Sequence, residues 1–274
     1  RSILLSATPA EELKDQKIIN NKFTTLNFLP DEEQVPDRVH IYKVESPQKD
    51  KLETLRQLLL TFRDGSSIVF LNFRDSVERT AEFLREAGFC ISYFHGGMEQ
   101  KQREDALYKF SNGSANIFVS TDLASRGLDI PDIDNIVHYH IPESEDGYIH
   151  RVGRTARWDK MGRSFFILNS DEHVPAYVDA EVDNYEIPEE LPKPALPKMS
   201  TIYIGKGKND KISKGDIVGF LCKKAGLKKD EIGKIDVQDR FAYAAVARQK
   251  LQNVLKQTSG EKKKKKKTIV EEVK

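Results

Sequence analysis

Residues 116–140 read NIFVSTDLASRGLDIPDIDNIVHYH. Two short apolar runs, residues 116–121 and 135–140, stand on either side of a turn that contains Gly127 and a short helical stretch. A short apolar run bounded by turn residues is typical of a strand that is buried on both faces. Two such strands joined through a helical segment predict parallel strands of one sheet.

The same alternation of strand-like and helix-like segments continues in both directions along the chain. Amphipathic segments separate the apolar runs, as expected of helices that cover a sheet. The apolar runs are residues 39–44, 67–72, 91–95 and 164–168, and the amphipathic segments are residues 49–62, 75–87, 99–110 and a helix from Glu145. The pattern predicts an α/β domain over residues 39–170, with a parallel sheet and helices on both of its faces.

Other segments flank this predicted domain. Residues 1–30 hold two short apolar runs around a polar helix, and a linker follows at residues 31–38. Because the first apolar run starts directly after Arg1, we expect the chain to be a fragment of a longer protein. Four prolines between residues 188 and 197 predict that residues 171–199 form a stiff, Pro-rich linker.

The last segment, residues 200–274, predicts a second and smaller domain. Its strand-like and helix-like runs follow the order βαββαβ, which is typical of a small α+β domain with an open sheet and two helices on one face. Ser213 stands three residues before Asp216, a spacing that favours the start of a helix because the two side chains can accept hydrogen bonds from free N–H groups.

The composition is ordinary for a globular protein, with 38% hydrophobic and 32% charged residues. No apolar run approaches the ~20 residues of a membrane helix, so we expect no membrane partner. The two cysteines, Cys90 and Cys222, fall in different predicted domains. This favours a reducing compartment, the cytoplasm, over a disulfide framework, and we expect a monomer.

Charge is divided unevenly between the two parts of the chain. Residues 1–197 hold 23 Lys and Arg against 34 Asp and Glu, whereas residues 198–274 hold 21 against 9. The formal charges are therefore −11 and +12. The basic segment predicts a polyanionic partner, of which nucleic acid backbones are the commonest.

The stretch HRVGRTAR at residues 150–157 places Arg151, Arg154 and Arg157 at intervals of three. Side chains at this spacing on a helix can project in one general direction. Arginine is always charged and forks onto phosphate oxygens, which suits the stabilisation of a phosphoryl group during transfer. The alternative is a solvated basic helix end without a ligand.

Polar residues and glycines follow other predicted strands. Thr121 ends a strand and leads into a turn and a short helix, whose free N–H groups could bind phosphate. Asp129 could accept from a ribose hydroxyl, although Asp122 and Asp129 could equally cap the loop. Gly96 follows another strand, where glycine lets a phosphate backbone approach closely.

Four stretches, taken in order, resemble motifs of the DEAD-box family of ATP-dependent RNA helicases. LLSATP at residues 4–9 resembles motif III, IVFLN at 68–72 motif IV, STDLASRGLD at 120–129 motif V, and HRVGRTAR motif VI. The resemblance implies that residues 39–170 form the second RecA-like domain. It also implies that residues 1–30 are the end of a first one.

The resemblance implies roles for individual residues. Arg154 and Arg157 would be arginine fingers that act on ATP, and Asp129 would contact the ribose. The cofactor would be ATP with Mg²⁺, bound mainly by the first RecA-like domain. The residues that would couple ATP to RNA are Ser6, Thr8 and His150, and those that would contact RNA phosphates are Gly96, Arg103 and Thr121.

Two positions depart from the family pattern, and two motifs are lacking. Ala156 stands where the family usually has Gly, and Phe73 stands where it often has Thr, so that one RNA-facing hydroxyl is lost. The sequence contains neither a GxxxxGK[ST] phosphate loop nor a DEAD stretch. We therefore expect the chain alone to be inactive as an ATPase.

The basic segment resembles an RNA-recognition motif. IYIGKGKNDKI at residues 202–212, GDIVGFL at 215–221 and GKIDV at 233–237 are similar to the C-terminal domain of DbpA-type helicases. The partner of that domain in the family is a hairpin of large-subunit ribosomal RNA. The resemblance therefore implies a ribosomal RNA hairpin and an adjacent duplex as partners.

Strand alternation predicts an aromatic RNA-binding face in this segment. Tyr203, Phe241 and Tyr243 would lie on the open face of the sheet and stack on bases, next to Arg240. The alternative is that the rings pack under a loop or under the linker. Arg240 and Val246 favour the alternative, because they replace a glycine and an aromatic residue of the usual motif.

Two further patterns carry weaker expectations. The six lysines at residues 262–267 are either a solvated, disordered run or a loop that contacts phosphates with little selectivity. His138 and His140 share one face of a strand, but nothing indicates a third ligand, so no metal site is predicted.

The sequence therefore predicts the C-terminal part of an ATP-dependent RNA helicase that remodels structured RNA, in large-subunit ribosome assembly. The complete enzyme would be an RNA-stimulated ATP hydrolase. One alternative is a non-catalytic RNA-binding or regulatory module that keeps a helicase-like scaffold. Another is a DNA-directed relative, which the RNA-recognition segment disfavours.

Overall fold

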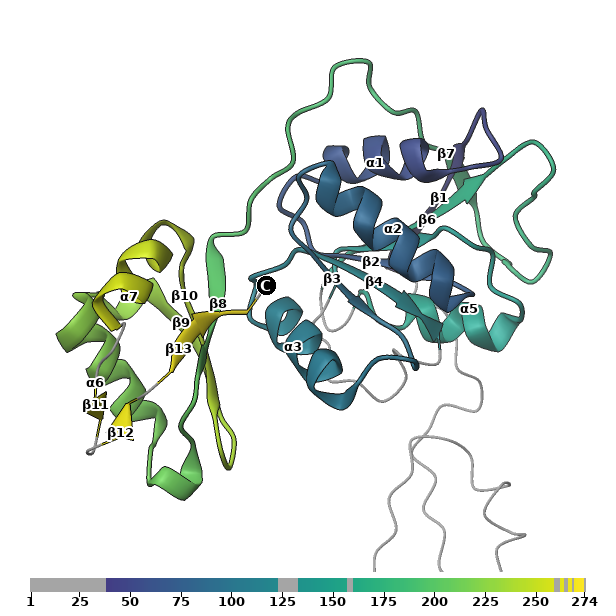
Figure 1. Ribbon diagram of the computed structural model, residues 1–274. Coiled ribbons are helices and arrows are strands. Elements are labelled where there is room, and N and C mark those ends of the chain that lie inside the picture. The colour runs from purple at the N-terminus through teal and green to yellow at the C-terminus, as the bar shows by residue number, and fades with distance from the viewer. Residues whose placement is uncertain are drawn as a thin grey trace, which may run out of the picture.

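The computed structural model describes residues 38–122, 133–156, 160–258, 262–263, 266–267 and 269–273 (Figure 1). Within these residues the larger sheet has seven strands in the order β3-β4-β2-β5-β6-β1-β7. Every neighbouring pair in it is parallel. The predicted α/β fold with a parallel sheet is confirmed.

Strands and helices of the larger domain alternate along the chain, close to the predicted bounds. They are β1 (Val39–Glu45), α1 (Leu52–Thr61), β2 (Ser67–Leu71), α2 (Arg74–Glu86), β3 (Ile91–Phe94), α3 (Gln100–Ser111), β4 (Ile117–Thr121), β5 (Asn135–His138), α5 (Glu145–Val152), β6 (Gly162–Leu168) and β7 (Val182–Asn184).

Both faces of this sheet are covered by helices, as predicted. On β2, Val69 and Leu71 belong to the cluster that contains the buried leucines of α1 and Leu84 of α2. Ile68 and Phe70 point the other way and pack with α3. All four strand side chains are fully buried. This two-sided burial explains why residues 68–71 of β2 are all apolar and do not alternate with polar residues.

The segment at residues 171–199, predicted as a Pro-rich linker, also packs on the larger domain. Its strand β7 pairs with β1 at the edge of the sheet. The ring of Tyr185 lies 5.7 Å from that of Tyr42 and 5.2 Å from that of Phe165, and its hydroxyl donates to Thr61 Oγ1 at 3.0 Å. Aromatic and apolar residues between the prolines therefore make this segment a strap that extends the core.

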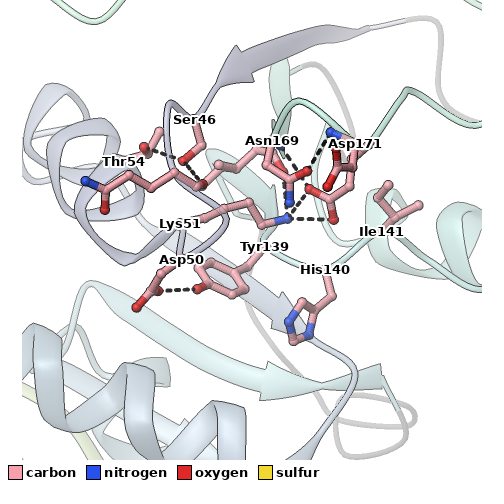
Figure 2. A network of polar contacts seen from close by, with 12 residues as sticks. Ser46, Asp50, Lys51, Thr54, Tyr139, His140, Ile141, Asn169 and Asp171 are labelled. Atoms are coloured by element: carbon pink, nitrogen blue, oxygen red, sulfur yellow. Dashed lines mark hydrogen bonds and ion pairs between the residues drawn. The ribbon is translucent and has the colours of Figure 1, made fainter.

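The buried side chain of Lys51 connects the start of the strap to the end of strand β6 (Figure 2). Lys51 is 3% exposed, and its Nζ donates to Glu172 Oε2 at 2.8 Å and to the carbonyl of Ile167 at 2.9 Å. Its ammonium group lies 5.3 Å from the ring centroid of Tyr139, whose hydroxyl donates to Asp50 Oδ1 at 3.4 Å. Burial lowers the pKa of Lys51, and the Glu172 carboxylate opposes that shift.

The smaller domain follows the strap and has the predicted βαββαβ order. Its elements are β8 (Met199–Ile204), α6 (Lys214–Ala225), β9 (Ile232–Val237), β10 (Ala242–Ala247), α7 (Leu251–Thr258) and β13 (Val270–Glu272), with a short pairing of β11 (Lys262–Lys263) and β12 (Lys266–Lys267) between the last two. The four main strands form an antiparallel sheet in the order β13-β8-β10-β9. Both helices pack on one side of it.

Helix α6 begins as the sequence predicts. Ser213 Oγ accepts from the amide of Asp216 at 3.2 Å, and Asp216 Oδ2 accepts from the amide of Ser213 at 3.0 Å. These bonds satisfy two of the N–H groups that a helix start leaves unpaired. Among the described residues, no helix is long and apolar enough to cross a bilayer.

Packing of the strap gives a stability prediction. We expect Tyr185→Ala to lower the free energy of unfolding by ~2 kcal/mol, because a half-buried ring and its hydrogen bond are both lost. Tyr185→Phe should cost ~1 kcal/mol, since only the bond to Thr61 is removed. Urea denaturation followed by circular dichroism measures both. A linker that merely connects the domains would leave both variants as stable as the parent chain.

Candidate functional site

The carboxyl ends of β2, β4 and β5 lie side by side, because β2 pairs with β4 on one side and with β5 on the other. Asn72 follows β2, Asp122 follows β4, and His140 stands two residues after β5. Ligands of open parallel sheets bind at this edge, outside the carboxyl ends of the strands. The candidate site is therefore this edge, together with the turn after α5.

Arg151 connects these three strand ends. Its Nε and Nη2 donate to the two carboxylate oxygens of Asp122 at 2.5 and 2.6 Å. Its Nη2 also donates to Asn72 Oδ1 at 2.9 Å, and its Nη1 donates to the carbonyl of His140 at 2.7 Å. The side chain is only 1% exposed. We call Arg151, Asp122, Asn72 and His140 the Arg151 cluster.

His138 lies beneath the Arg151 cluster in a fully buried position. Its Nε2 is 2.9 Å from Ser164 Oγ, and its Nδ1 is 3.5 Å from Arg151 Nη1. The imidazole stacks on Phe166 with 4.3 Å between ring centroids. Burial, and then the Arg151 charge, hold the pKa of His138 well below its usual value. The neutral ring can accept at Nδ1 and donate at Nε2, which matches its two neighbours.

The turn after α5 is fixed by a neighbouring segment. The amide of Ile133 donates to the carbonyl of Arg154 at 3.2 Å, and Thr155 Oγ1 donates to the carbonyl of Ile133. Ala156 has a φ of +54°, the left-handed region that favours glycine. This conformation explains why a glycine is usual here and why alanine is tolerated only at the cost of some backbone strain.

Two of the predicted ATP-related residues lie at this turn. Arg154 is half-buried in it, directly after α5, and His150 lies on α5 with its Nε2 3.2 Å from Asp146 Oδ1. Arg157, Asp129, Ser6 and Thr8 lie outside the described residues, so their predicted roles stay predictions. Among the described residues, no group of three or more His, Cys, Asp and Glu could hold a metal ion.

The glycine loop after β3 leads into the first turn of α3. The amide of Gly97 donates to His95 Nδ1 at 3.2 Å, and His95 Nε2 is 2.9 Å from Glu78 Oε1. Gly96 is exposed, and Arg74 lies against the loop, with Nη2 3.6 Å from where a Gly96 Cβ would stand. A larger residue at Gly96 would therefore contact this guanidinium.

The other two predicted phosphate contacts flank this loop. Arg103 lies on the first turns of α3, and its Nε is buried without a hydrogen-bond partner among the described residues. Thr121 ends β4 on the neighbouring strand and is 8% exposed. Gly96 and Thr121 thus lie at the carboxyl ends of two adjacent strands, and Arg103 lies on the helix that follows the first of them.

Phe73 occupies the position where the family often has threonine. It is 62% exposed at the start of α2, and its ring meets the edge of the His140 ring with centroids 5.7 Å apart. The lost hydroxyl is therefore replaced by an apolar ring that faces outward beside the Arg151 cluster.

The open aromatic face predicted for the smaller domain is not open. Tyr243 is 1% exposed because α3 covers it, so its ring cannot stack on a base in this arrangement. Tyr203 and Phe241 are half-buried and Arg240 is exposed. Tyr243 is covered, as the alternative expected, but not by a loop or by the linker. The covering element is α3, which neither prediction named.

Sequence reasoning gave no separate role to Arg151. Its spacing made it one of three equivalent arginines, whereas the structure buries it and directs the fork inward. The available signal was a polar residue at the end of each apolar run or directly after it, namely Asn72, Asp122 and His140. A buried guanidinium requires such acceptors.

Comparisons with known proteins agree with this geometry. Residues 50–159 match the model of the helicase conserved C-terminal domain. The DEAD-box protein SrmB of E. coli, solved bound to regulator of ribonuclease activity A, superposes with a TM-score of 0.52 and 33% identity over 58% of this chain and 97% of that chain. A DEAD box protein from Methanococcus jannaschii gives a TM-score of 0.51 and 27% identity over 56% and 43% of the two chains. The larger domain is a RecA-like helicase C-terminal domain.

The smaller domain also matches a known family of domains. Residues 201–272 match the DbpA RNA binding domain. The ATP-dependent RNA helicase DbpA of Escherichia coli is 32% identical over 223 residues, which are 79% of this chain and 49% of the relative. DbpA of Bacillus subtilis is 29% identical over 241 residues, 78% of this chain and 50% of the relative. The chain belongs to the DEAD-box family. It is similar to the C-terminal half of the DbpA proteins and spans about half the length of these relatives.

Burial of two histidines predicts a pH dependence of stability. Burial lowers the pKa of His140 to about 4, and that of His138 also lies well below the usual 6.5. Below pH 6.5 the unfolded chain therefore binds protons that the folded chain does not. We expect the free energy of unfolding to fall as the pH decreases from about 7 to about 5, by up to ~1.4 kcal/mol per pH unit for each ring.

Urea denaturation across this pH range measures the effect. His140→Asn should reduce the slope of stability against pH, whereas His40→Asn, at an exposed position on β1, provides the matched control. An unchanged slope in His140→Asn would contradict the assignment to this ring.

Proposed function

We propose that this chain is the C-terminal half of an ATP-dependent RNA helicase. In the proposal, a preceding RecA-like domain supplies the phosphate loop, and this chain completes the ATP site and one side of the RNA site. The Arg151 cluster carries the proposal, because it joins three strand ends directly before the turn with Arg154. The activity of the DbpA relatives supports it.

The three arginines of residues 150–157 would have different roles. Arg151 directs its guanidinium to acceptors within the protein, so it is unsuited to reach ATP. Arg154 and Arg157 follow in the next turn and would stabilise the charge on the γ-phosphate, with Asp129 at the ribose. Mg²⁺ with its ATP would be held mainly by the preceding domain. His150, Ser6 and Thr8 would couple the state of ATP to RNA.

RNA would enter at the opposite end of the same sheet edge. Gly96 allows close approach, the buried Arg103 Nε lacks a partner among the described residues, and Thr121 ends the neighbouring strand. Arginine and backbone N–H groups are the usual phosphate contacts. Closing of the two RecA-like domains on ATP would bend the bound RNA strand and so separate a short RNA duplex.

The smaller domain would hold structured RNA nearby. Its match to the DbpA RNA binding domain and the charge of +12 over residues 198–274 support this role. We propose a ribosomal RNA hairpin with an adjacent duplex as the partner, in assembly of the large ribosomal subunit, and a monomer in the cytoplasm. Arg240 is exposed beside this sheet and stays a candidate for RNA contact.

An ATPase assay tests the arginine assignment. The part of E. coli DbpA that precedes the matched region would be joined ahead of Arg1, and ATP turnover measured with and without RNA. Arg154→Ala and Arg157→Ala should each lower kcat by about 10³-fold while RNA binding is retained. Arg79→Ala, an exposed arginine of α2, is the control. Normal turnover in both finger variants would reject the assignment, and RNA binding without any turnover in the parent chimera would favour a non-catalytic scaffold.

A second assay tests the RNA target. We expect turnover of the same chimera to be stimulated most by RNA that contains the ribosomal hairpin, less by unrelated RNA and least by DNA. Kinetics at constant ionic strength would measure this order, because phosphate contacts are strongly salt-dependent. Equal stimulation by all three nucleic acids would contradict the ribosomal target.

A further inference from the structure

The aromatic face of the small sheet rests on helix α3 of the larger domain (Figure 1). The hydroxyl of Tyr243 donates to the carboxylate of Asp105. The ring of Tyr243 lies against that of Tyr108, with 4.4 Å between centroids and an interplanar angle of 37°. The ring of Tyr108 therefore covers the face of Tyr243 on which a base could otherwise stack.

One face of α3 serves this contact along its whole length. Lys101 Nζ lies 5.3 Å from the ring centroid of Tyr203, and Asn112 Nδ2 donates to Thr201 Oγ1 at 2.8 Å. With Asp105 and Tyr108 between them, the contact residues recur every three or four positions. That spacing places them on one stripe of the helix.

The contact continues beyond the end of α3. Thr201 Oγ1 also donates to Ser114 Oγ at 2.9 Å. Arg248 donates from Nη2 to the carbonyl of Ser114 at 3.2 Å and from Nε to the carbonyl of Pro197 at 2.6 Å. The small domain is therefore held through directed hydrogen bonds as well as through the stacked rings.

Charge at this face opposes RNA. Burial raises the pKa of the Tyr243 hydroxyl, and the carboxylates of Asp105 and Glu104 raise it further. The negative potential of these carboxylates disfavours a charged phenolate, and it disfavours an RNA phosphate group for the same reason. Arg248 and Lys234 of the small domain do reach the larger domain. Its exposed lysines on α6 and in the turn after it lie away from this contact, at Lys214, Lys223, Lys224, Lys228 and Lys229.

We propose that the aromatic sheet face of the small domain is a docking surface for α3 and takes no part in binding RNA. Tyr243, Tyr108 and Asp105 form the centre of that surface. The docking half of the proposal stands on the observed contacts, whereas the RNA half rests on the proposed RNA-binding function of the small domain.

Two variants on α3 test the docking while leaving the small domain intact. Asp105→Lys reverses the charge under Tyr243, and Tyr108→Ser removes the stacked ring. Glu82→Lys, on the exposed side of α2, introduces the same change of charge away from the contact. Hydrogen exchange of the β8 and β10 amides and small-angle scattering of the 274-residue chain report docking. Fluorescence anisotropy with a labelled RNA hairpin reports binding.

In both α3 variants the amide hydrogens of β8 and β10 should exchange about tenfold faster than in the parent chain, because a local contact is lost. The radius of gyration should increase for the same reason. Their Kd for RNA should stay within about twofold of Glu82→Lys for the charged variant and of the parent chain for Tyr108→Ser. A stacked base is worth ~1–3 kcal/mol, or about five- to 150-fold in Kd, so a contribution from this face would be visible.

Three outcomes would overturn the proposal. Tighter RNA binding on undocking would mean that α3 masks an RNA platform. Weaker binding with unchanged exchange would mean that the residues contact RNA directly, and unchanged exchange with unchanged binding would mean that α3 does not hold the domain. Failure of the parent chain to bind any RNA would instead count against the proposed function, and the exchange measurement would still decide the docking.

Discussion

The candidate site depends on a guanidinium that is buried under the edge of a parallel sheet. Arg151 is stable there only because two carboxylate oxygens, an amide oxygen and a carbonyl oxygen converge on it from three different strand ends. Removing either partner of a buried ion pair commonly costs ~3–5 kcal/mol, since a charge is left uncompensated. The positions of Asn72, Asp122 and the His140 carbonyl are therefore constrained to one arrangement, and the turn that follows α5 is positioned by them.

Packing around this turn adds a second constraint. Thr155 bonds to Ile133, and Gly162 at the start of β6 has no side chain because a Cβ there would collide with Thr155. Ala156 follows with a φ of +54°, in the left-handed region. Arg154 thus lies in a turn that is fixed on two sides, and such rigid support is what its proposed role at the γ-phosphate would require.

The helices and strands could be predicted well from the sequence, whereas the contacts between distant elements could not, for one physical reason. Burial on both faces leaves a continuous apolar run, and a capping pair marks a helix start, so β2 and α6 could be recognised from neighbouring residues alone. Alternation also assigned Tyr243 to the correct face of its strand. It could not reveal that α3, more than 130 residues earlier in the chain, covers that face. Arg151 was underestimated for the same reason, since its partners Asn72 and Asp122 are 79 and 29 residues away.

Helix α3 packs against both sheets, and the geometry of a helix makes this possible. Ala106 and Phe110 face the core of the larger domain, while Asp105 and Tyr108 face the smaller sheet. Positions one or two apart on a helix point in different directions, so neither set interferes with the other. The helix uses acidic and neutral groups at the centre of its outer face, and the exposed lysines of α6 stay outside the contact. The basic domain is therefore anchored while the exposed lysines of α6 stay available to a polyanion.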